Sequence, residues 1–302
     1  MIDPSQWTNL GGLFFVARHL VQGMWTGPHA SIRHGRGLDF HDYRSYVPGD
    51  NPAEVDWKLY GRTDRYYVKR NQQLTDLSAY ILIDCSASMD FARLDRAGRS
   101  LRGAKVMTKL RYAQMLAAAI AFLTIRQGDR AGVGLYGSKL IEHVAPGGSW
   151  AQLQRVCSVI EGAKPQAAGN AAEAIKQAHA LRMRRGLLVL ISDLLDEPAP
   201  LFEALSRFRH DRFDIVVFQV LSPQELDLAG LERARMQMID SESKDRVRTD
   251  ISRMQKRYGE LISGHIAALR RGCQARHIDY NLLTTDEPVT AALRKYVSRR
   301  GR

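Results

Sequence analysis

The sequence predicts an α/β protein with a doubly wound, mostly parallel sheet flanked by helices, and three observations support this fold class. Continuous apolar runs at 80–83, 187–191 and 213–221 are typical of strands buried on both faces of a parallel sheet. Segments of helical period lie between these runs, as the crossover connections of a parallel sheet require. Two of the runs lead into an aspartate, Asp84 and Asp193, at the strand ends where such folds bind ligands.

The N-terminal part, residues 1–76, is expected to be an appendage to an α/β domain that spans residues 77–302. Apolar side chains at spacings of three and four between residues 7 and 25 predict an amphipathic helix that packs on the domain. Residues 26–76 are rich in glycine, histidine and charge, which is typical of irregular structure. The aromatic side chains of this segment, Trp57 foremost, favour packing on the α/β domain over a free arm.

Within residues 77–302, strands and helices alternate. The segment 110–125 is apolar on nearly all sides, which predicts a helix buried against the sheet. Periodicity and turn residues predict further strands at 130–136, 139–144 and 278–283, a hairpin at 232–239 and 245–249, and helices at 150–160, 171–181, 200–209, 250–274 and 288–298.

A series of basic residues from Arg93 to Lys109 interrupts this alternation just before the apolar helix. Such a series predicts a basic loop beside the end of the first apolar strand. Two interpretations stay open for it: a loop that receives an acidic partner, or a solvated loop without a binding role.

The composition is that of a globular protein with a core of ordinary size, since 45% of the 302 residues are hydrophobic and 25% are charged. The formal charge of +12 permits nucleic acid or acidic partners. No nucleic-acid module is recognisable, and aromatic residues do not interleave with the basic ones, so a solvated basic surface is favoured and no specific nucleic acid is expected.

Three scattered cysteines without a Cys-x-x-Cys pair indicate a reducing compartment and argue against a zinc site. The sequence shows no secretory signal and no apolar stretch long enough to cross a bilayer. We therefore expect a cytoplasmic protein without a transmembrane segment.

Oxygen-bearing side chains gather directly after the first apolar run. Asp84, Ser86 and Ser88 follow one another at every second residue, and Asp193 ends a second strand. A carboxylate and two hydroxyls in one loop can surround a small hard cation, and Mg²⁺ is expected because no soft ligand is present. The alternative is that Asp84 and Ser86 only cap the segment that follows them.

Two motifs in the sequence resemble motifs of known protein families. Asp84-x-Ser86-x-Ser88 with the later Ile-Ser-Asp193 resembles the metal-ion-dependent adhesion site of von Willebrand factor A domains. Upstream, the sequence Arg44-x-Tyr46-x-Pro-Gly49-Asp50-(x5)-Asp56-Trp57-(x4)-Arg62 resembles the signature of a bacterial family with that fold, the domain-of-unknown-function family numbered fifty-eight.

The resemblance implies a ligand set and a partner. Asn170 stands in the third loop, where the adhesion site has a threonine, so the implied ligands are Asp84, Ser86, Ser88, Asn170 and Asp193. It also implies that an acidic side chain of another protein completes the metal site. Relatives are typically found beside MoxR-type AAA+ ATPases, which implies such an ATPase as partner in chaperone-like or complex-maturation work.

Enzyme motifs are missing from the sequence. A haloacid-dehalogenase-like phosphatase requires a second aspartate where Ser86 stands, and an EF-hand requires glycine where Met89 stands. The sequence contains no Gly-x4-Gly-Lys-Ser/Thr loop, no Gly-x-Ser-x-Gly and no His-Glu-x-x-His. We therefore expect a non-enzymatic protein-interaction module. The alternative is a metal-dependent hydrolase or a nucleic-acid-associated factor that uses the same acidic edge.

Overall fold

The computed structural model describes residues 12–25, 42–47, 55, 57–70, 77–91, 107–166, 168–181, 183–227, 235–239 and 246–300. Contacts divide the chain into two compact units, and the division runs through the expected N-terminal appendage. Residues 1–25, which include helix α1 (Leu13–Trp25), group with residues 77–302, whereas residues 26–76 form the second unit. Each unit is described by itself.

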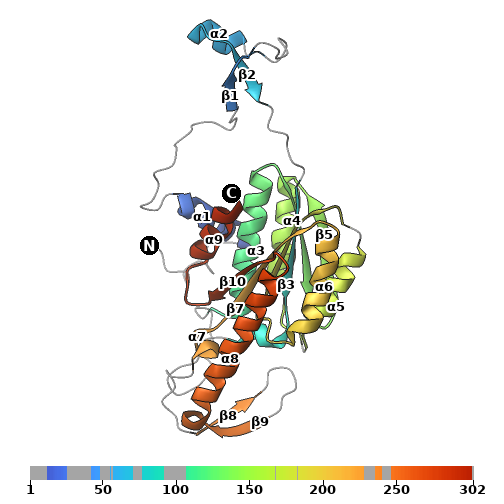
Figure 1. Cartoon of the computed structure of the whole chain (residues 1–302), viewed down its shortest axis with the longest axis vertical. Helices are drawn as coiled ribbons and strands as arrows, with labels where there is room; N and C mark the ends of the chain where they lie inside the picture. Colours follow the sequence, from blue (N-terminus) through green and yellow to red (C-terminus); the bar gives the residue numbers. More distant parts are fainter. Residues whose placement is uncertain are drawn as a thin grey trace. The chain divides into compact units, whose positions relative to one another are not determined.

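The first unit contains a six-stranded sheet of order β10-β7-β6-β3-β4-β5 (Figure 1). Every neighbouring pair is parallel except β4 and β5, which are antiparallel. The strands are β3 (Ser78–Asp84), β4 (Arg130–Tyr136), β5 (Leu140–Gly147), β6 (Gly186–Ser192), β7 (Asp214–Leu221) and β10 (Asp279–Thr284). The predicted mostly parallel sheet is therefore confirmed, with the antiparallel strand at one edge.

Helices cover both faces of this sheet, which confirms the doubly wound arrangement. The central strand β3 shows why, because its apolar side chains alternate between two separate cores. Ile81 and Ile83 belong to one core with residues of α1, α3 (Lys109–Arg126), α4 (Trp150–Gly162) and α9 (Val289–Arg300). Tyr80 and Leu82 belong to the other, with residues of α5 (Ala171–Ala180), α6 (Pro198–His210) and α8 (Ile251–Gln274).

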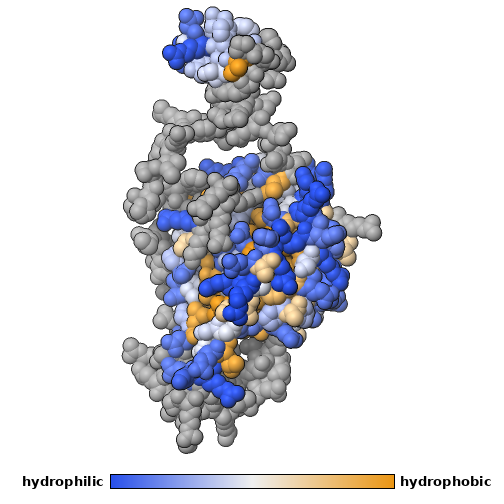
Figure 2. Space-filling view, viewed as in Figure 1, coloured by the Kyte–Doolittle hydropathy of each residue, from blue (hydrophilic) through white to orange (hydrophobic). Residues whose placement is uncertain are grey.

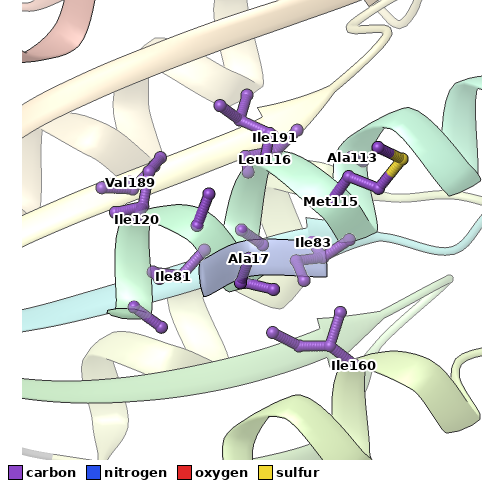
Figure 3. Packing of buried hydrophobic residues seen from close by; sticks show 14 of the residues in the cluster. Ala17, Ile81, Ile83, Ala113, Met115, Leu116, Ile120, Ile160, Val189 and Ile191 are labelled. Carbon is purple, nitrogen blue, oxygen red and sulfur yellow. The ribbon is translucent and has the colours of Figure 1, made fainter. Parts of the chain in front are cut away.

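Helix α3 is the centre of the first core and is buried along nearly its whole length, as its apolar sequence predicts. Its alanines let it approach the sheet and α1 closely. Figure 3 shows Ala113, Leu116 and Ile120 of α3 in one cluster with Ile81 of β3 and Ala17 of α1. Thr108 caps the helix by accepting a hydrogen bond from the Arg111 backbone N–H at 3.0 Å.

Helix α8 extends from beside β10 to a second, two-stranded sheet (Figure 1). Strands β8 (Arg235–Ile239) and β9 (Arg246–Asp250) pair antiparallel, as expected for the predicted hairpin. A short helix, α7 (Pro223–Leu226), follows β7 and contacts α8. On the face shown in Figure 2, the described surface is mostly hydrophilic with scattered apolar groups.

The second unit contains a hairpin of β1 (Asp42–Ser45) and β2 (Tyr67–Arg70) together with helix α2 (Trp57–Thr63). Three rings cluster in it: Tyr60 stacks on Tyr66 with centroids 4.5 Å apart, and Trp57 meets both edge-on. Trp57 is 61% exposed. The expected packing of this segment on the α/β domain stays a prediction. Of the signature residues, Pro48, Gly49, Asp50 and Asp56 lie outside the described residues.

None of the helices in the described part of the chain has the length and apolar character that a membrane crossing requires.

Candidate functional site

The candidate site lies at the carboxyl ends of β3 and β6, two adjacent parallel strands in the middle of the sheet. Ile83 pairs with Ile191 in their register, so the loops that follow the two strands begin side by side. Asp84 ends β3, and Asp193 directly follows β6. Each is 4% exposed. The topology therefore brings the two predicted carboxylates to one edge, as the sequence analysis expects.

Asp84 is held by hydrogen bonds from the loop after β3 and from the last residue of β6. Its Oδ1 accepts a bond from the Ser86 backbone N–H at 2.8 Å, and its Oδ2 accepts one from the Ser192 hydroxyl at 2.6 Å. Asp84 thus caps the turn after β3, as the alternative interpretation expects of it, and at the same time links β3 to β6. The Ser86 side chain makes no capping bond to the short 3₁₀ helix that follows (Ala87–Asp90).

The two serine hydroxyls are placed as neighbouring ligands of a small cation would be. Ser86 Oγ and Ser88 Oγ lie 2.9 Å apart. Adjacent ligands of an octahedral Mg²⁺ with bonds of about 2.1 Å are about 3.0 Å apart. Both hydroxyls and the nearby carboxylate are hard oxygen donors, which suit Mg²⁺ better than a soft metal. The residues Asp84, Ser86 and Ser88 therefore fit a divalent hard cation.

Asn170 caps helix α5 in the structure, and its implied role as a metal ligand stays a prediction. Its Oδ1 accepts a hydrogen bond from the Glu173 backbone N–H at 2.9 Å, so Asn170 is the N-cap of α5. It also lines a pocket of about 220 Å³ together with Leu194 and Asp196. No described contact joins its side chain to the other four predicted ligands.

Lys109 is a buried charged residue at this edge that the sequence analysis did not single out. Its side chain is fully buried, and its Nζ donates to Asp193 Oδ2 at 2.8 Å and to Glu225 Oε1 at 2.5 Å. The expectation of a basic loop is therefore wrong for Lys109, which is the first residue of α3. The rest of the basic series, residues 93–106, lies outside the described residues.

One local signal could have marked Lys109. A positive charge in the first turn of a helix is unfavourable, because the helix dipole places partial positive charge there. Lys109 directly follows the cap Thr108 and is the first residue of a helix that is buried on nearly all sides. A lysine in such a position requires acidic partners from elsewhere in the fold, although the sequence does not say which ones.

The electrostatics of the edge follow from burial and from these pairs. Burial, and after it the charge of Asp193, raise the pKa of Asp84 to about 7, against the hydrogen bonds from Ser192 and Ser86, which lower it. For Lys109, burial opposes the charged form, but the Asp193 and Glu225 carboxylates outweigh it and raise the pKa above its ordinary value. The ammonium of Lys109 is therefore a permanent positive charge inside the site.

The loop that carries Asp193 is fixed on both sides. Gln219 Nε2 donates to the Asp193 carbonyl at 2.7 Å, and the Leu194 N–H donates to Ser192 Oγ at 3.0 Å. Leu194 has a φ of +50°, and its carbonyl lies 2.7 Å from His265 Nε2 of α8. A bulky residue in the left-handed region is strained, and such strain gathers at functional sites where the surroundings enforce it.

Two further observations limit what the edge can do. Among the described residues, no three histidine, cysteine, aspartate or glutamate side chains gather closely enough to hold a metal by themselves, so hydroxyls would have to contribute.

The Tyr136 hydroxyl is buried without a hydrogen-bond partner in the described part of the chain. Burial and the charge of Asp84 raise the pKa of Tyr136 well above its ordinary value, so this phenol stays protonated at neutral pH.

The chain is similar to several known proteins. The sequence model of the family described as "Protein of unknown function DUF58" matches residues 42–267. An uncharacterized protein of Mycobacterium tuberculosis is 26% identical over 307 residues, which cover 99% of this chain and 91% of the relative. The solved structure of the conserved hypothetical protein BatB from Bacteroides thetaiotaomicron is 13% identical, covers 74% of this chain and 98% of that one, and gives a TM-score of 0.46. The VWA domain of SpRpn10 is 12% identical, with coverages of 48% and 75% and a TM-score of 0.34.

Proposed function

Because this chain belongs to the family described as "Protein of unknown function DUF58", we propose that it is a non-enzymatic protein-interaction module. Its binding edge is formed by the loops after β3 and β6. The observation that carries the proposal is the placement of Asp84, Ser86 and Ser88, with the two hydroxyls 2.9 Å apart at the carboxyl end of the central strand. Side chains of this kind bind a cation or a polar ligand, and none of them is an activated nucleophile.

A divalent cation, with Mg²⁺ as the first expectation, is part of the proposal. Ser86 and Ser88 would hold it through their hydroxyls, with the carboxylates of Asp84 and Asp193 beside it. When bound, the ion supplies a positive charge that an acidic side chain of a partner protein can engage. Asp84 and Ser192 position the loops, and Gln219 keeps the Asp193 backbone in place.

The proposed partner is a MoxR-type AAA+ ATPase, in a chaperone-like or complex-maturation role. Two things support it: the resemblance to a family that accompanies such ATPases, and the absence of a phosphate-binding Gly-x4-Gly-Lys-Ser/Thr loop from this sequence. ATP-driven work would then belong to the partner. A cytoplasmic location is also part of the proposal and is supported by three cysteines that are buried and unpaired.

The test is association with the purified ATPase, measured by pull-down and by calorimetry, in Mg²⁺ and in chelator. We expect binding in Mg²⁺, loss of binding in chelator, and loss for Asp84→Asn and for Ser86→Ala. Glu142→Gln, which changes an exposed carboxylate on the edge strand β5, is the matched control and should bind like the parent. Circular dichroism establishes that each variant is folded.

Two results would revise the proposal. Binding that persists in chelator removes the metal from the mechanism and keeps the partnership. A failure to bind in every nucleotide state, together with Mg²⁺-dependent turnover of a phosphoester that Asp84→Asn abolishes, would replace the interaction module with a hydrolase.

A further inference from the structure

The ammonium of Lys109 is a buried positive charge at the candidate binding edge. Its Nζ lies between two carboxylates that come from different loops, Asp193 after β6 and Glu225 of α7. The ammonium also lies over the Phe91 ring, with the nitrogen 5.8 Å from the ring centroid. The Lys109 side chain has no exposed surface. The ammonium therefore cannot reach solvent or a partner directly, and its only described ionic partners are these two carboxylates.

The stability of the fold alone does not explain why one ammonium and two carboxylates are buried together. Burying an ammonium and two carboxylates costs desolvation free energy that their attraction repays only in part, and apolar residues of similar volume often serve the core as well. The position is also unfavourable for a cation, since Lys109 lies in the first turn of α3, at the positive end of the helix dipole. The arrangement points to a role in the charge balance of the edge itself.

Asp193 is the link between the internal cation and the proposed metal. Its Oδ2 is bound to Lys109, and its charge acts on Asp84, whose own carboxylate is hydrogen-bonded on both oxygens. If Ser86 and Ser88 held a divalent ion, Asp193 would therefore attract that ion only weakly, because the Lys109 ammonium already neutralises most of the Asp193 charge. In addition, the two cations repel each other across a buried edge, where charges are screened less than in water.

We infer that Lys109 sets the divalent-cation affinity of this edge: its ammonium keeps the ion weakly held in the free protein, so that a partner's carboxylate is needed to complete tight binding. This inference rests on the proposed function, because it assumes that the edge takes a cation. It adds an affinity-determining residue that lies outside the ligand set. The chain would then bind metal and partner together, with each one strengthening the binding of the other.

The experiment measures Mn²⁺ binding to the full chain without any partner, by the electron paramagnetic resonance signal of the free ion, with Mg²⁺ titration calorimetry beside it. The variant is the pair Lys109→Met with Glu225→Gln, which removes the ammonium and one of its two carboxylates and so leaves the net charge of the buried cluster unchanged. Lys109→Met alone is measured too, if it folds. Lys139→Met, at an exposed position after β4, controls for the general loss of a positive charge.

We expect the double variant to bind Mn²⁺ at least about tenfold more tightly than the parent, because Asp193 is released from its ion pair with Lys109 and its full charge becomes available to the ion at a weakly screened site. Lys139→Met should change the affinity less than about twofold. Adding Asp193→Asn to the double variant should cancel most of the gain, since the liberated carboxylate is the group through which Lys109 acts.

A folded double variant that binds Mn²⁺ no more tightly than the parent would overturn the inference. So would the absence of detectable Mn²⁺ binding in both proteins, because the edge would then take no cation at all. These outcomes are separate from the fate of the proposed function, which is decided by association with the ATPase. The parent and its Asp84→Asn variant can still differ in that association when neither binds Mn²⁺.

Discussion

Asp84 is a carboxylate whose environment disfavours its charged form. It is 4% exposed, and burial together with the charge of Asp193 raises its pKa to about 7, compared with an ordinary value of 3.8. Its protonated form is therefore favoured far more strongly than that of an ordinary aspartate. A bound divalent cation would favour the charged form, so cation binding and proton release at this residue are linked.

The first prediction concerns the pH dependence of stability. Because the folded pKa of Asp84 is raised, the folded state holds a proton that the unfolded state has already lost between about pH 4 and pH 7. The free energy of unfolding should therefore fall as pH rises through this window, and the penalty should be complete above it. Each unit of pKa shift corresponds to about 1.4 kcal/mol, so the full effect is a few kcal/mol.

Asp84→Asn removes this titration and should flatten the profile. Urea unfolding of the parent and the variant, at several pH values between 4 and 8 in chelator, measures the difference between the two profiles. Other groups titrate in both proteins and cancel in that difference. Parallel profiles for parent and variant would show that Asp84 ionises normally in the fold.

At the scale of elements, the site depends on how closely β3 and β6 approach each other. The start of this pairing places Gly186 opposite Ser78, and a Cβ built on Gly186 would lie 2.0 Å from the Ser78 carbonyl oxygen. That oxygen belongs to backbone, so the strands would have to move apart. Asp84 and Asp193 lie at the carboxyl ends of the same two strands, so moving the strands apart would also change the positions of these two carboxylates.

The second prediction is that Gly186→Ala destabilises the protein by about 1–3 kcal/mol, the usual cost of overpacking, or by more if the pairing breaks. The control is Gly162→Ala at the end of α4, where an added Cβ would meet nothing within 4 Å. That substitution should be neutral or slightly stabilising, since alanine is the better helix former. Thermal and urea unfolding of both variants provides the comparison. Equal stability of the two would mean that the β3–β6 approach is not limiting.

At the scale of the whole molecule, ligand binding to the native state should appear as a shift in the unfolding temperature. A cation that binds only the folded chain stabilises it by mass action. For a dissociation constant of about 1 mM, 10 mM Mg²⁺ contributes about 1.4 kcal/mol. For a domain of this size, that is a rise in Tm of about 3 °C.

The third prediction is that this rise occurs in the parent, disappears in Asp84→Asn, and grows when Lys109→Met is combined with Glu225→Gln. Scanning calorimetry in Mg²⁺ and in chelator measures it, and the same concentration of Na₂SO₄ with chelator controls for ionic strength. The formal charge of +12 makes this control necessary, because salt also screens repulsion within the chain. An equal rise in all three proteins would assign the effect to ionic strength.

The sequence by itself determined the elements and the chemistry at the strand ends. The apolar runs at 80–83 and 187–191 are local patterns, and each carries its own evidence for a buried strand. Once both are strands of one parallel sheet, topology alone brings Asp84 and Asp193 to the same edge. The Asp84-x-Ser86-x-Ser88 spacing is equally local, which is why the residues that fit a cation could be named without coordinates.

Only the tertiary structure decided which charges neutralise these residues and which hydrogen bonds fix them. Lys109 meets Asp193 across 84 positions of sequence and Glu225 across 116. No local periodicity predicts a contact between residues so far apart in the sequence. The sequence pattern therefore predicted Lys109 to be part of the basic loop before it. Likewise, Asn170 is an N-cap because α5 begins directly after it. The grouping of α1 with residues 77–302 follows from its packing against α3. In each case the deciding free energy comes from burial and charge pairing between distant segments, which exist only once the chain is folded.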